Sequence, residues 1–233
     1  MTLQKHQTAF IYRLQFARRG SLSYVGHLDL MRTFERSLRR AGLPILHSQG
    51  YNPRPMLVFA LPLGVGISTS DDYIDVSLSE ETDVSDLIGT LQKYVPDGLE
   101  ILSGRQVPET GGSIMAVVTA ASYSLRAPRI AEALRNLMNR EEVLAEKKSK
   151  GQIRKLDIRP LILRIIADDR ASGDEVSVLV RAGSHENLRP DLLLAALTAY
   201  EDYPQEDAAN CEVERTGLFT GTYPDLIRLK EMR

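Results

Sequence analysis

The hydrophobic periodicity of the first hundred residues changes in a fixed order, and this order restricts the fold more than any other feature. Segments with alternating apolar residues, typical of strands, are separated by segments whose apolar residues recur every three or four positions, typical of helices. They predict a strand, a helix, two strands, a second helix and a last strand, at residues 10–16, 27–41, 56–61, 73–78, 84–94 and 99–102. This order, βαββαβ, is that of a ferredoxin-like module. We expect residues 1–107 to form it.

The same order of elements recurs after a linker at residues 107–113, where Pro108 and two consecutive glycines interrupt both periodicities. The segments predicted there are residues 116–125, 130–148, 161–167, 175–181, 189–200 and 211–218. The repeat lies in the order of elements and not in residue identity. We therefore expect an α+β chain of tandem ferredoxin-like modules with antiparallel sheets, the second module covering residues 108–233. The two sheets can pack face to face or align edge to edge.

Cysteine and histidine are scarce in this chain. Cys211 is the single cysteine, so no internal disulfide can form, which is typical of a reducing compartment. One thiol cannot hold an iron–sulfur cluster, and the four histidines lack the short spacing of a zinc site. No apolar run approaches the roughly 20 residues of a membrane span, and residues 1–12 lack the layout of a secretory signal. We therefore expect a cytoplasmic protein without metal or cofactor.

The formal net charge of −2 conceals an uneven distribution. Between Arg13 and Arg54 the chain has eight arginines, no lysine and two acidic residues, a net charge of +6 that leaves −8 for the remainder. A second basic cluster spans residues 147–159. Such clusters on an acidic chain indicate oriented binding to a polyanion, although a solvated face is the simpler interpretation of any one of them. Arginine without lysine favours the polyanion, because the planar guanidinium suits phosphate and stacks on bases.

The predicted first helix separates its apolar and basic residues. Leu30, Phe34, Leu38 and Ala41 form an apolar stripe that faces the core. The basic residues lie on a different face, within one or two turns of each other. These candidates for phosphate binding are Arg32, Arg36, Arg39 and Arg40.

A short strand is predicted at residues 43–47, and the loop that follows it concentrates polar and aromatic groups. Loops of this composition on a rigid scaffold usually carry binding or catalysis. A tyrosine can stack on an unpaired base, an arginine can bind phosphate, and amides can read a base edge. The candidate RNA-binding residues are His47, Gln49, Tyr51, Asn52 and Arg54. The simpler alternative is a turn that only connects two strands.

The entry to the first helix, residues 23–29, is a third candidate. Backbone N–H groups at a helix start attract anions, so we expect a phosphate there beside Arg18 and Arg19, with His27 close by. If His27 and His47 approach each other, they form an acid–base pair for metal-independent RNA cleavage. Alternatively, His27 is a local cap or a buried histidine.

The second basic cluster surrounds a glycine and ends in Asp157-Ile158-Arg159-Pro160, just before a predicted strand. It can add phosphate contacts through Lys150, Arg154 and Lys155. An interaction between Asp157 and Arg159 is the purely structural alternative.

Several separated segments resemble one family, the radical SAM-linked proteins. The segments are Gly26-His27-Leu28-Asp29-Leu30-Met31-Arg32, Ser48-Gln49-Gly50-Tyr51-Asn52-Pro53-Arg54-Pro55, Phe59-Ala60-Leu61-Pro62-Leu63-Gly64-Val65-Gly66, Asp157-Ile158-Arg159-Pro160, Leu188-Arg189-Pro190-Asp191 and Arg215-Thr216. The resemblance covers nearly the whole chain. This bacterial family of unknown function includes free-standing chains and domains fused behind a cobalamin-binding radical SAM enzyme. The resemblance implies that the cluster cysteines belong to that enzyme, and neighbouring RNA-processing genes imply a role in RNA modification.

The function expected from these observations is that of a non-catalytic, RNA-binding accessory or substrate-recognition protein. It would act with a separate radical SAM enzyme in RNA modification, away from any membrane. One alternative is a metal-independent RNA-processing enzyme of the endoribonuclease type. Another is a protein-interaction module whose basic face docks on an acidic partner without RNA.

Overall fold

The computed structural model of the chain describes residues 8–109, 112–149, 152–167 and 173–232. Backbone contacts divide the chain into two compact units, Met1–Val117 and Val118–Arg233. Within each unit the described strands pair antiparallel. The chain is therefore a mixed α+β protein with antiparallel sheets, which confirms the fold class predicted at that level.

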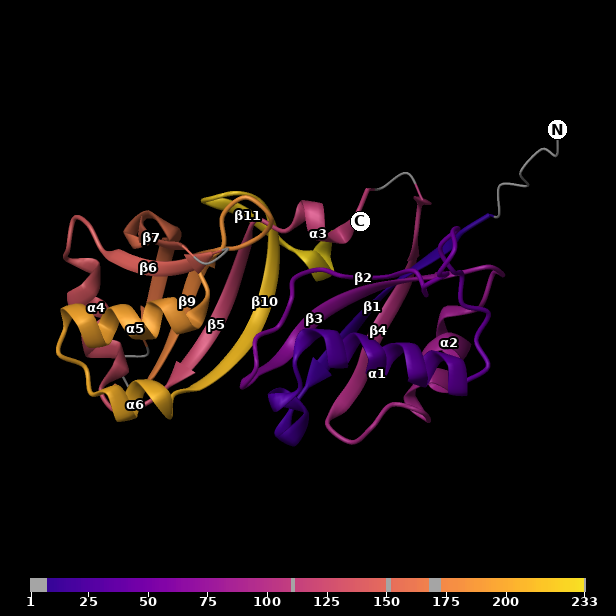
Figure 1. Ribbon diagram of the computed structural model, residues 1–233, viewed down its shortest axis with the longest axis horizontal. Coiled ribbons are helices and arrows are strands. Elements are labelled where there is room, and N and C mark those ends of the chain that lie inside the picture. The colour runs from indigo at the N-terminus through magenta and orange to yellow at the C-terminus, as the bar shows by residue number, and fades with distance from the viewer. Residues whose placement is uncertain (1–7, 110–111, 150–151, 168–172, 233) are drawn as a thin grey trace. The chain divides into compact units, whose positions relative to one another are not determined.

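In the described part of the first unit, four strands form a sheet in the spatial order β4-β1-β3-β2 (Figure 1). The strands are β1 (Phe10–Arg18), β2 (Leu57–Phe59), β3 (Ile67–Leu78) and β4 (Leu99–Val107). The helices are a 3-10 helix (Gly20–Tyr24), α1 (His27–Arg40), α2 (Val84–Gln92) and the short α3 (Ile114–Val117). Consequently α1 connects β1 to β2, and α2 connects β3 to β4.

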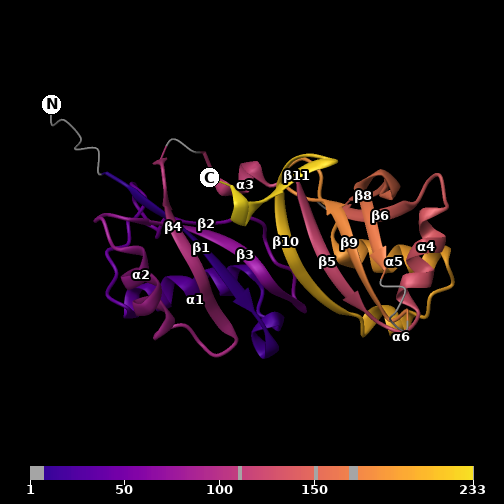
Figure 2. The same ribbon diagram turned by 180° about the vertical axis from the view of Figure 1, so that it is seen from behind.

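Helices α1 and α2 cover one face of this sheet, and Figure 2 shows the unit from the other side. Leu30, Phe34 and Leu38 of α1 are buried there with Leu87 and Leu91 of α2. The alternating strand residues that meet them are Tyr12, Leu14, Phe16, Ile74, Val76 and Leu78. The rings of Phe16 and Phe34 pack edge to face, with 5.2 Å between their centroids. The sequence prediction that Leu30, Phe34 and Leu38 face the core is confirmed. Ala41, the fourth residue of the predicted stripe, follows the last residue of α1 and is only half-buried.

The opposite face of the same sheet carries buried polar side chains. Arg13 and Asp75, which are paired in register, form a two-pronged ion pair with Nε–Oδ1 2.8 Å and Nη2–Oδ2 3.0 Å. Beside them, Asp71 accepts hydrogen bonds from Gln15 Nε2 at 2.8 Å and from the Tyr73 hydroxyl at 2.5 Å. The sheet is thus apolar towards its helices and polar on its other face.

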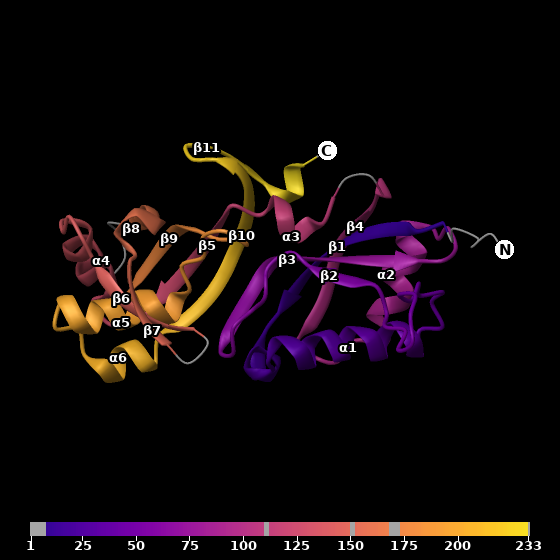
Figure 3. The ribbon, with the colours of Figure 1, turned by 45° about the horizontal axis from the view of Figure 1, so that its top comes forward.

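In the described part of the second unit, five strands form a sheet in the order β11-β10-β5-β9-β8 (Figure 3). These strands are β5 (Ala120–Arg126), β8 (Ile162–Ala167), β9 (Glu175–Arg181), β10 (Glu212–Thr222) and β11 (Asp225–Arg228). A separate hairpin consists of β6 (Leu144–Ser149) and β7 (Gln152–Asp157). The helices are α4 (Ile130–Met138), α5 (Pro190–Tyr200), α6 (Gln205–Ala209) and two 3-10 helices (Arg159–Leu161 and Leu229–Glu231).

Helices α4 and α5 lie on one face of the second sheet in both Figure 1 and Figure 3. Their buried leucines meet Val176, Val178 and Val180 of β9, which alternate with exposed or half-buried residues. The segment predicted at residues 189–200 is confirmed as α5, which begins at Pro190; proline fits the first helical turn because that position has no intrahelical partner for an N–H.

Three predicted segments differ from the structure in the type of element over all or part of their length. The helix expected at residues 130–148 ends at Met138, and Leu144–Ser149 pairs with β7 as a strand. The strand expected at 116–125 begins only at Ala120, because residues 114–117 form α3. Residues 43–47 make isolated bridges and no continuous strand; Pro44 in this segment has no N–H to donate to a ladder.

Candidate nucleic-acid interface

Helix α1 presents an arginine stripe, defined here as Arg32, Arg36, Arg39 and Arg40. All four side chains are exposed, whereas Leu30, Phe34 and Leu38 are fully buried. At 3.6 residues per turn, the four positions fall within an arc of about 100° on the face opposite the core. The structure therefore brings the four arginines to one surface, as the sequence predicts.

The arginines of the stripe differ in the groups that surround them. Arg32 pairs with Asp29 one turn earlier at 2.8 Å, and both side chains are more than 60% exposed, so the pair is weak. The guanidinium of Arg40 lies 5.9 Å from the ring centroid of Tyr94. Among the described residues, no carboxylate pairs with Arg36 or Arg39. Three positive charges of the stripe are thus not neutralised by a described ion pair.

The loop predicted to read RNA is a closed turn with an exposed tip. At its base the Ser48 N–H donates to the Arg54 carbonyl at 2.8 Å, and the Arg54 N–H donates to Ser48 Oγ at 3.0 Å. The tip residues Gln49, Tyr51 and Asn52 are exposed, Tyr51 completely so at 101%. The Arg54 side chain is exposed as well. The ring of Tyr51 is thus exposed on a turn whose two ends are hydrogen-bonded to each other. It is available for stacking on a base, and the closed turn loses little conformational freedom when a ligand binds.

Arg18, predicted to bind phosphate at the helix entry, is instead buried completely. Its guanidinium donates hydrogen bonds to three backbone carbonyls, those of Val25 at 2.9 Å, Gly64 at 2.9 Å and Ile67 at 2.5 Å. Arg18 therefore joins the segment before α1 to the segment before β3 and is not accessible to a phosphate. Arg19, the next residue, is 60% exposed and lies 3.8 Å from Glu100.

His27 and His47 lie at opposite ends of α1. His27 begins the helix and packs edge to face on Phe59, with 5.1 Å between the ring centroids. His47 lies beyond the other end of the helix, and its Nδ1 is 3.0 Å from the Ile45 carbonyl. The N–H of the preceding residue, Leu46, donates to the Ser77 carbonyl. The 14-residue helix is about 20 Å long. The structure does not bring the two imidazoles together as an acid–base pair.

The second basic cluster belongs to the β6–β7 hairpin of the other unit. Lys155 is exposed on β7. Lys150 lies outside the described residues, and so does the side chain of Arg154. The hairpin is attached to α5, where the Tyr200 hydroxyl accepts the Leu144 N–H at 2.9 Å.

Asp157 and Arg159 have structural roles in this hairpin region. Asp157 Oδ1 accepts hydrogen bonds from the backbone N–H groups of Val143 and Arg159, both at 3.0 Å. The guanidinium of Arg159 donates to the Met138 carbonyl at 2.9 Å and to the Arg140 carbonyl at 3.2 Å. It thereby satisfies backbone carbonyls at and just after the end of α4, which have no partner within the helix. These contacts support the purely structural alternative for the Asp157–Arg159 motif.

Sequence reasoning missed two groups of polar residues in the first unit. One is the buried network of Arg13, Gln15, Asp71, Tyr73 and Asp75. Its signal was present, because polar residues occupy alternate positions in strands whose other positions are apolar. The other is Tyr94, whose position beside Arg40 depends on the packing of α2 and carries no local signal.

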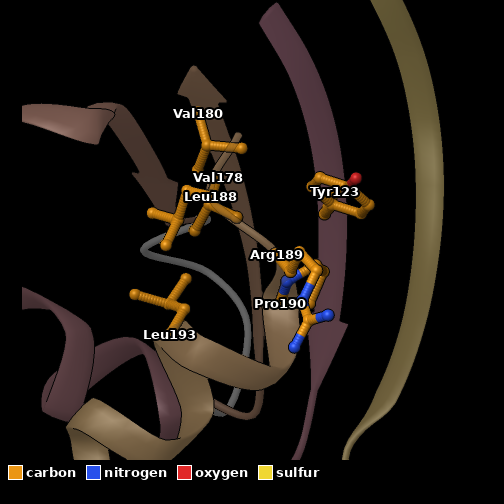
Figure 4. A pocket seen from close by; sticks show the side chains of 7 residues that line it. All are labelled: Tyr123, Val178, Val180, Leu188, Arg189, Pro190 and Leu193. Carbon is orange, nitrogen blue, oxygen red and sulfur yellow. The ribbon is translucent and has the colours of Figure 1, made fainter. Parts of the chain in front are cut away.

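Figure 4 shows a hollow beneath the start of α5 in the second unit. Six of its lining residues are hydrophobic, and it is too small to hold a water molecule. The remaining one, Arg189, is paired with Asp191 at 2.6 Å. The hollow is part of the core.

In the described ranges of the chain, no group of three or more His, Cys, Asp or Glu residues is placed to hold a metal ion. Nor is any helix there long and apolar enough to cross a membrane.

Fold and surface together define a mixed α+β protein that presents an arginine-lined helix and an exposed tyrosine turn. The chain belongs to the bacterial family described as "Uncharacterized protein conserved in bacteria (DUF2344)", whose pattern matches residues 12–190. The matched region includes α1 and the tyrosine turn. A comparison with curated protein sequences finds no match.

Proposed function

We propose that this protein binds single-stranded RNA through the arginine stripe of α1 and the exposed turn at residues 48–54, without catalysing a reaction itself. The observation that carries the proposal is the exposure of Arg36, Arg39 and Arg40 on one face without a described carboxylate partner. An unneutralised arginine row attracts a polyanion, and guanidinium groups bind phosphate through paired hydrogen bonds. Tyr51 then provides a stacking surface for an unpaired base.

We further propose that both units are ferredoxin-like modules. Support comes from the spatial order of the strands, which is β4-β1-β3-β2 in the first unit and β10-β5-β9-β8 in the second. In both units the strands of the motif, numbered along the chain, lie in the order fourth, first, third, second. Both follow the order βαββαβ, and the second unit adds to it the inserted β6–β7 hairpin, the short α6 and the final strand β11. A fold of this type says nothing by itself about activity.

We also propose that the protein acts as an accessory to a radical SAM enzyme on a separate chain, presenting RNA to it for modification. This part of the proposal depends on the resemblance of several segments to radical SAM-linked proteins. The single cysteine of the chain is consistent with a partner that supplies the cluster ligands. Co-purification of the two proteins after nuclease treatment would distinguish a direct contact from a connection through RNA.

The endoribonuclease alternative loses its main support from the separation of His27 and His47. A general acid and a general base must both reach the reacting phosphate within hydrogen-bond distance or through one water. His27 begins α1 and packs on Phe59, whereas His47 follows the other end of that helix and lies against the Ile45 carbonyl, so the two imidazoles do not form such a pair. The accessory function therefore takes precedence.

A salt titration tests RNA binding directly. Binding of a labelled random-sequence, single-stranded RNA is measured by fluorescence anisotropy over a range of salt concentrations. With about three phosphates neutralised by arginines, the logarithm of the association constant should fall with the logarithm of salt concentration with a slope of about −2. Affinity that does not respond to salt, or no binding at all, would refute the proposal.

A matched pair of variants locates the binding surface. Arg36→Ala/Arg39→Ala should weaken binding and reduce the salt slope by about 1.4, since each arginine accounts for about 0.7 on a single strand. The control Arg164→Ala/Lys230→Ala removes the same charge from exposed positions of the second unit and should leave the slope unchanged. Equal losses in both variants would indicate a general charge effect. Neither α1 change should unfold the protein, because alanine is the best helix former.

A further inference from the structure

The ring of Tyr94 belongs to the same surface as the arginine stripe, although it comes from a different helix. Tyr94 follows α2, and its N–H donates to the Leu91 carbonyl at 2.9 Å, which fixes its backbone. Its side chain is 37% exposed. The guanidinium carbon of Arg40, the last residue of α1, lies 5.9 Å from the ring centroid. Two planar groups from segments 54 positions apart in sequence thus lie together at the surface.

This pairing has the chemistry of a base-binding platform. Unpaired bases stack on aromatic rings and on guanidinium planes, and Arg40 and Tyr94 offer one of each. The arginine charge is attracted to the electron-rich face of the ring, so the ring restrains the guanidinium before any ligand arrives. The adjacent Lys93 is also exposed and adds positive charge at the end of α2. An RNA strand whose phosphates bind along the stripe would bring a base close to Arg40 and Tyr94.

We propose that Arg40 and Tyr94 form a binding site for one unpaired base of an RNA strand whose phosphates contact Arg36 and Arg39. This inference rests on the proposed RNA binding and adds a specific contact to it. Tyr94 contributes stacking and no charge, whereas the stripe contributes charge. The two contributions therefore respond differently to salt, which allows them to be tested separately.

The test uses a single-stranded oligouridine with 2-aminopurine at alternate positions, because the fluorescence of this base falls when it stacks. Binding to the unmodified protein should quench the signal. Tyr94→Ala should abolish most of the quenching and weaken binding roughly 5- to 150-fold, the range for loss of one base–aromatic stack, while the salt slope stays the same. Tyr94→Phe should retain both quenching and affinity, since the ring remains.

Arg40→Lys provides a second variant that does not depend on removing a ring. It keeps the positive charge and so the salt slope, but it loses the planar group and should reduce the quenching. Tyr223→Ala, whose side chain is exposed to a similar extent (39% against 37%), is the matched control and should behave like the unmodified protein.

The outcomes separate the two proposals. If the unmodified protein fails to bind the oligonucleotide and random-sequence RNA at any salt concentration, RNA binding itself is wrong. If it binds with the expected salt slope, but Tyr94→Ala quenches and binds as well as Tyr94→Phe, RNA binding stands and the base site is refuted. Loss of quenching in Tyr223→Ala to the same extent as in Tyr94→Ala would also refute the assignment of the site.

Discussion

The guanidinium of Arg13 and the carboxylate of Asp75 form a two-pronged ion pair whose side chains are only 7% and 9% exposed. They lie on neighbouring strands, in register, on the sheet face opposite α1 and α2. Arg13 belongs to the same arginine-rich stretch of sequence as the stripe. Because Asp75 neutralises the charge of Arg13 and both side chains are buried, Arg13 stabilises the sheet and is not available to a ligand.

Removing one partner of this pair should destabilise the protein strongly. Asp75→Ala leaves a buried guanidinium without its carboxylate and should lower the free energy of unfolding by about 3–5 kcal/mol. The double variant Arg13→Met/Asp75→Leu removes both charges and should recover most of that loss. Urea denaturation measures both values. Equal destabilisation in the single and the double variant would contradict the importance of the unpaired charge.

Arg18→Lys should destabilise the protein although it keeps the positive charge. A lysine ammonium cannot reach the carbonyls of Val25, Gly64 and Ile67 with the geometry of a guanidinium. The loss should be about 2 kcal/mol or more, since hydrogen bonds to a charged group are involved. Arg19→Lys, at the exposed neighbouring position, is the control and should leave thermal stability almost unchanged. A stable Arg18→Lys protein would show that the three carbonyls are satisfied by other means.

Asp83 should make the stability of the first unit depend on acid pH. It caps α2 and accepts hydrogen bonds from the Ser85 hydroxyl and from the N–H groups of Asp86 and Ser85. These bonds, the Ser85 hydroxyl first, lower the pKa of Asp83. Because the folded pKa lies below the unfolded value, the charged cap stabilises the protein above the unfolded pKa. That contribution is lost as the pH falls through the folded pKa.

Two variants and thermal melts at several pH values check this expectation. Asp83→Ala should lower the melting temperature at pH 7, and its difference from the unmodified protein should shrink on acidification. Asp83→Asn keeps a capping side chain but has no carboxyl to titrate, so its melting temperature should lack this part of the pH response. An Asn variant with the full acid response would assign that response to other groups.

Cys211 should react slowly with thiol reagents in the folded protein. Burial, with a further contribution from Glu212, raises the pKa of its thiol to about 11. The thiolate is the reactive form, so at pH 8 the folded protein should react on the order of 100-fold more slowly than the same cysteine in the denatured chain. The rate of colour release from an aromatic disulfide reagent measures the ratio. Similar rates before and after denaturation would mean that the thiol is not protected.

The sequence by itself determined the features that follow from local periodicity. The apolar spacing of Leu30, Phe34 and Leu38 settles which face of α1 is buried, and it settles equally that Arg32, Arg36, Arg39 and Arg40 are exposed. The start of α5 at Pro190 follows from proline chemistry in the same way. These features depend only on residues a few positions apart, so the local sequence is sufficient to specify them.

Only the tertiary structure decided which charges are available at the surface. Arg13 and Arg18 belong to the same arginine-rich stretch as Arg36, yet both are buried. One pairs with Asp75, and the other donates to three backbone carbonyls, two of them more than 40 positions away. The helix expected to continue from Met138 ends there, and its last carbonyl accepts a hydrogen bond from Arg159, 21 positions later. Tyr94 meets Arg40 because α1 and α2 pack side by side. Burial and pairing arise from segments far apart in the chain, and no local pattern carries that information.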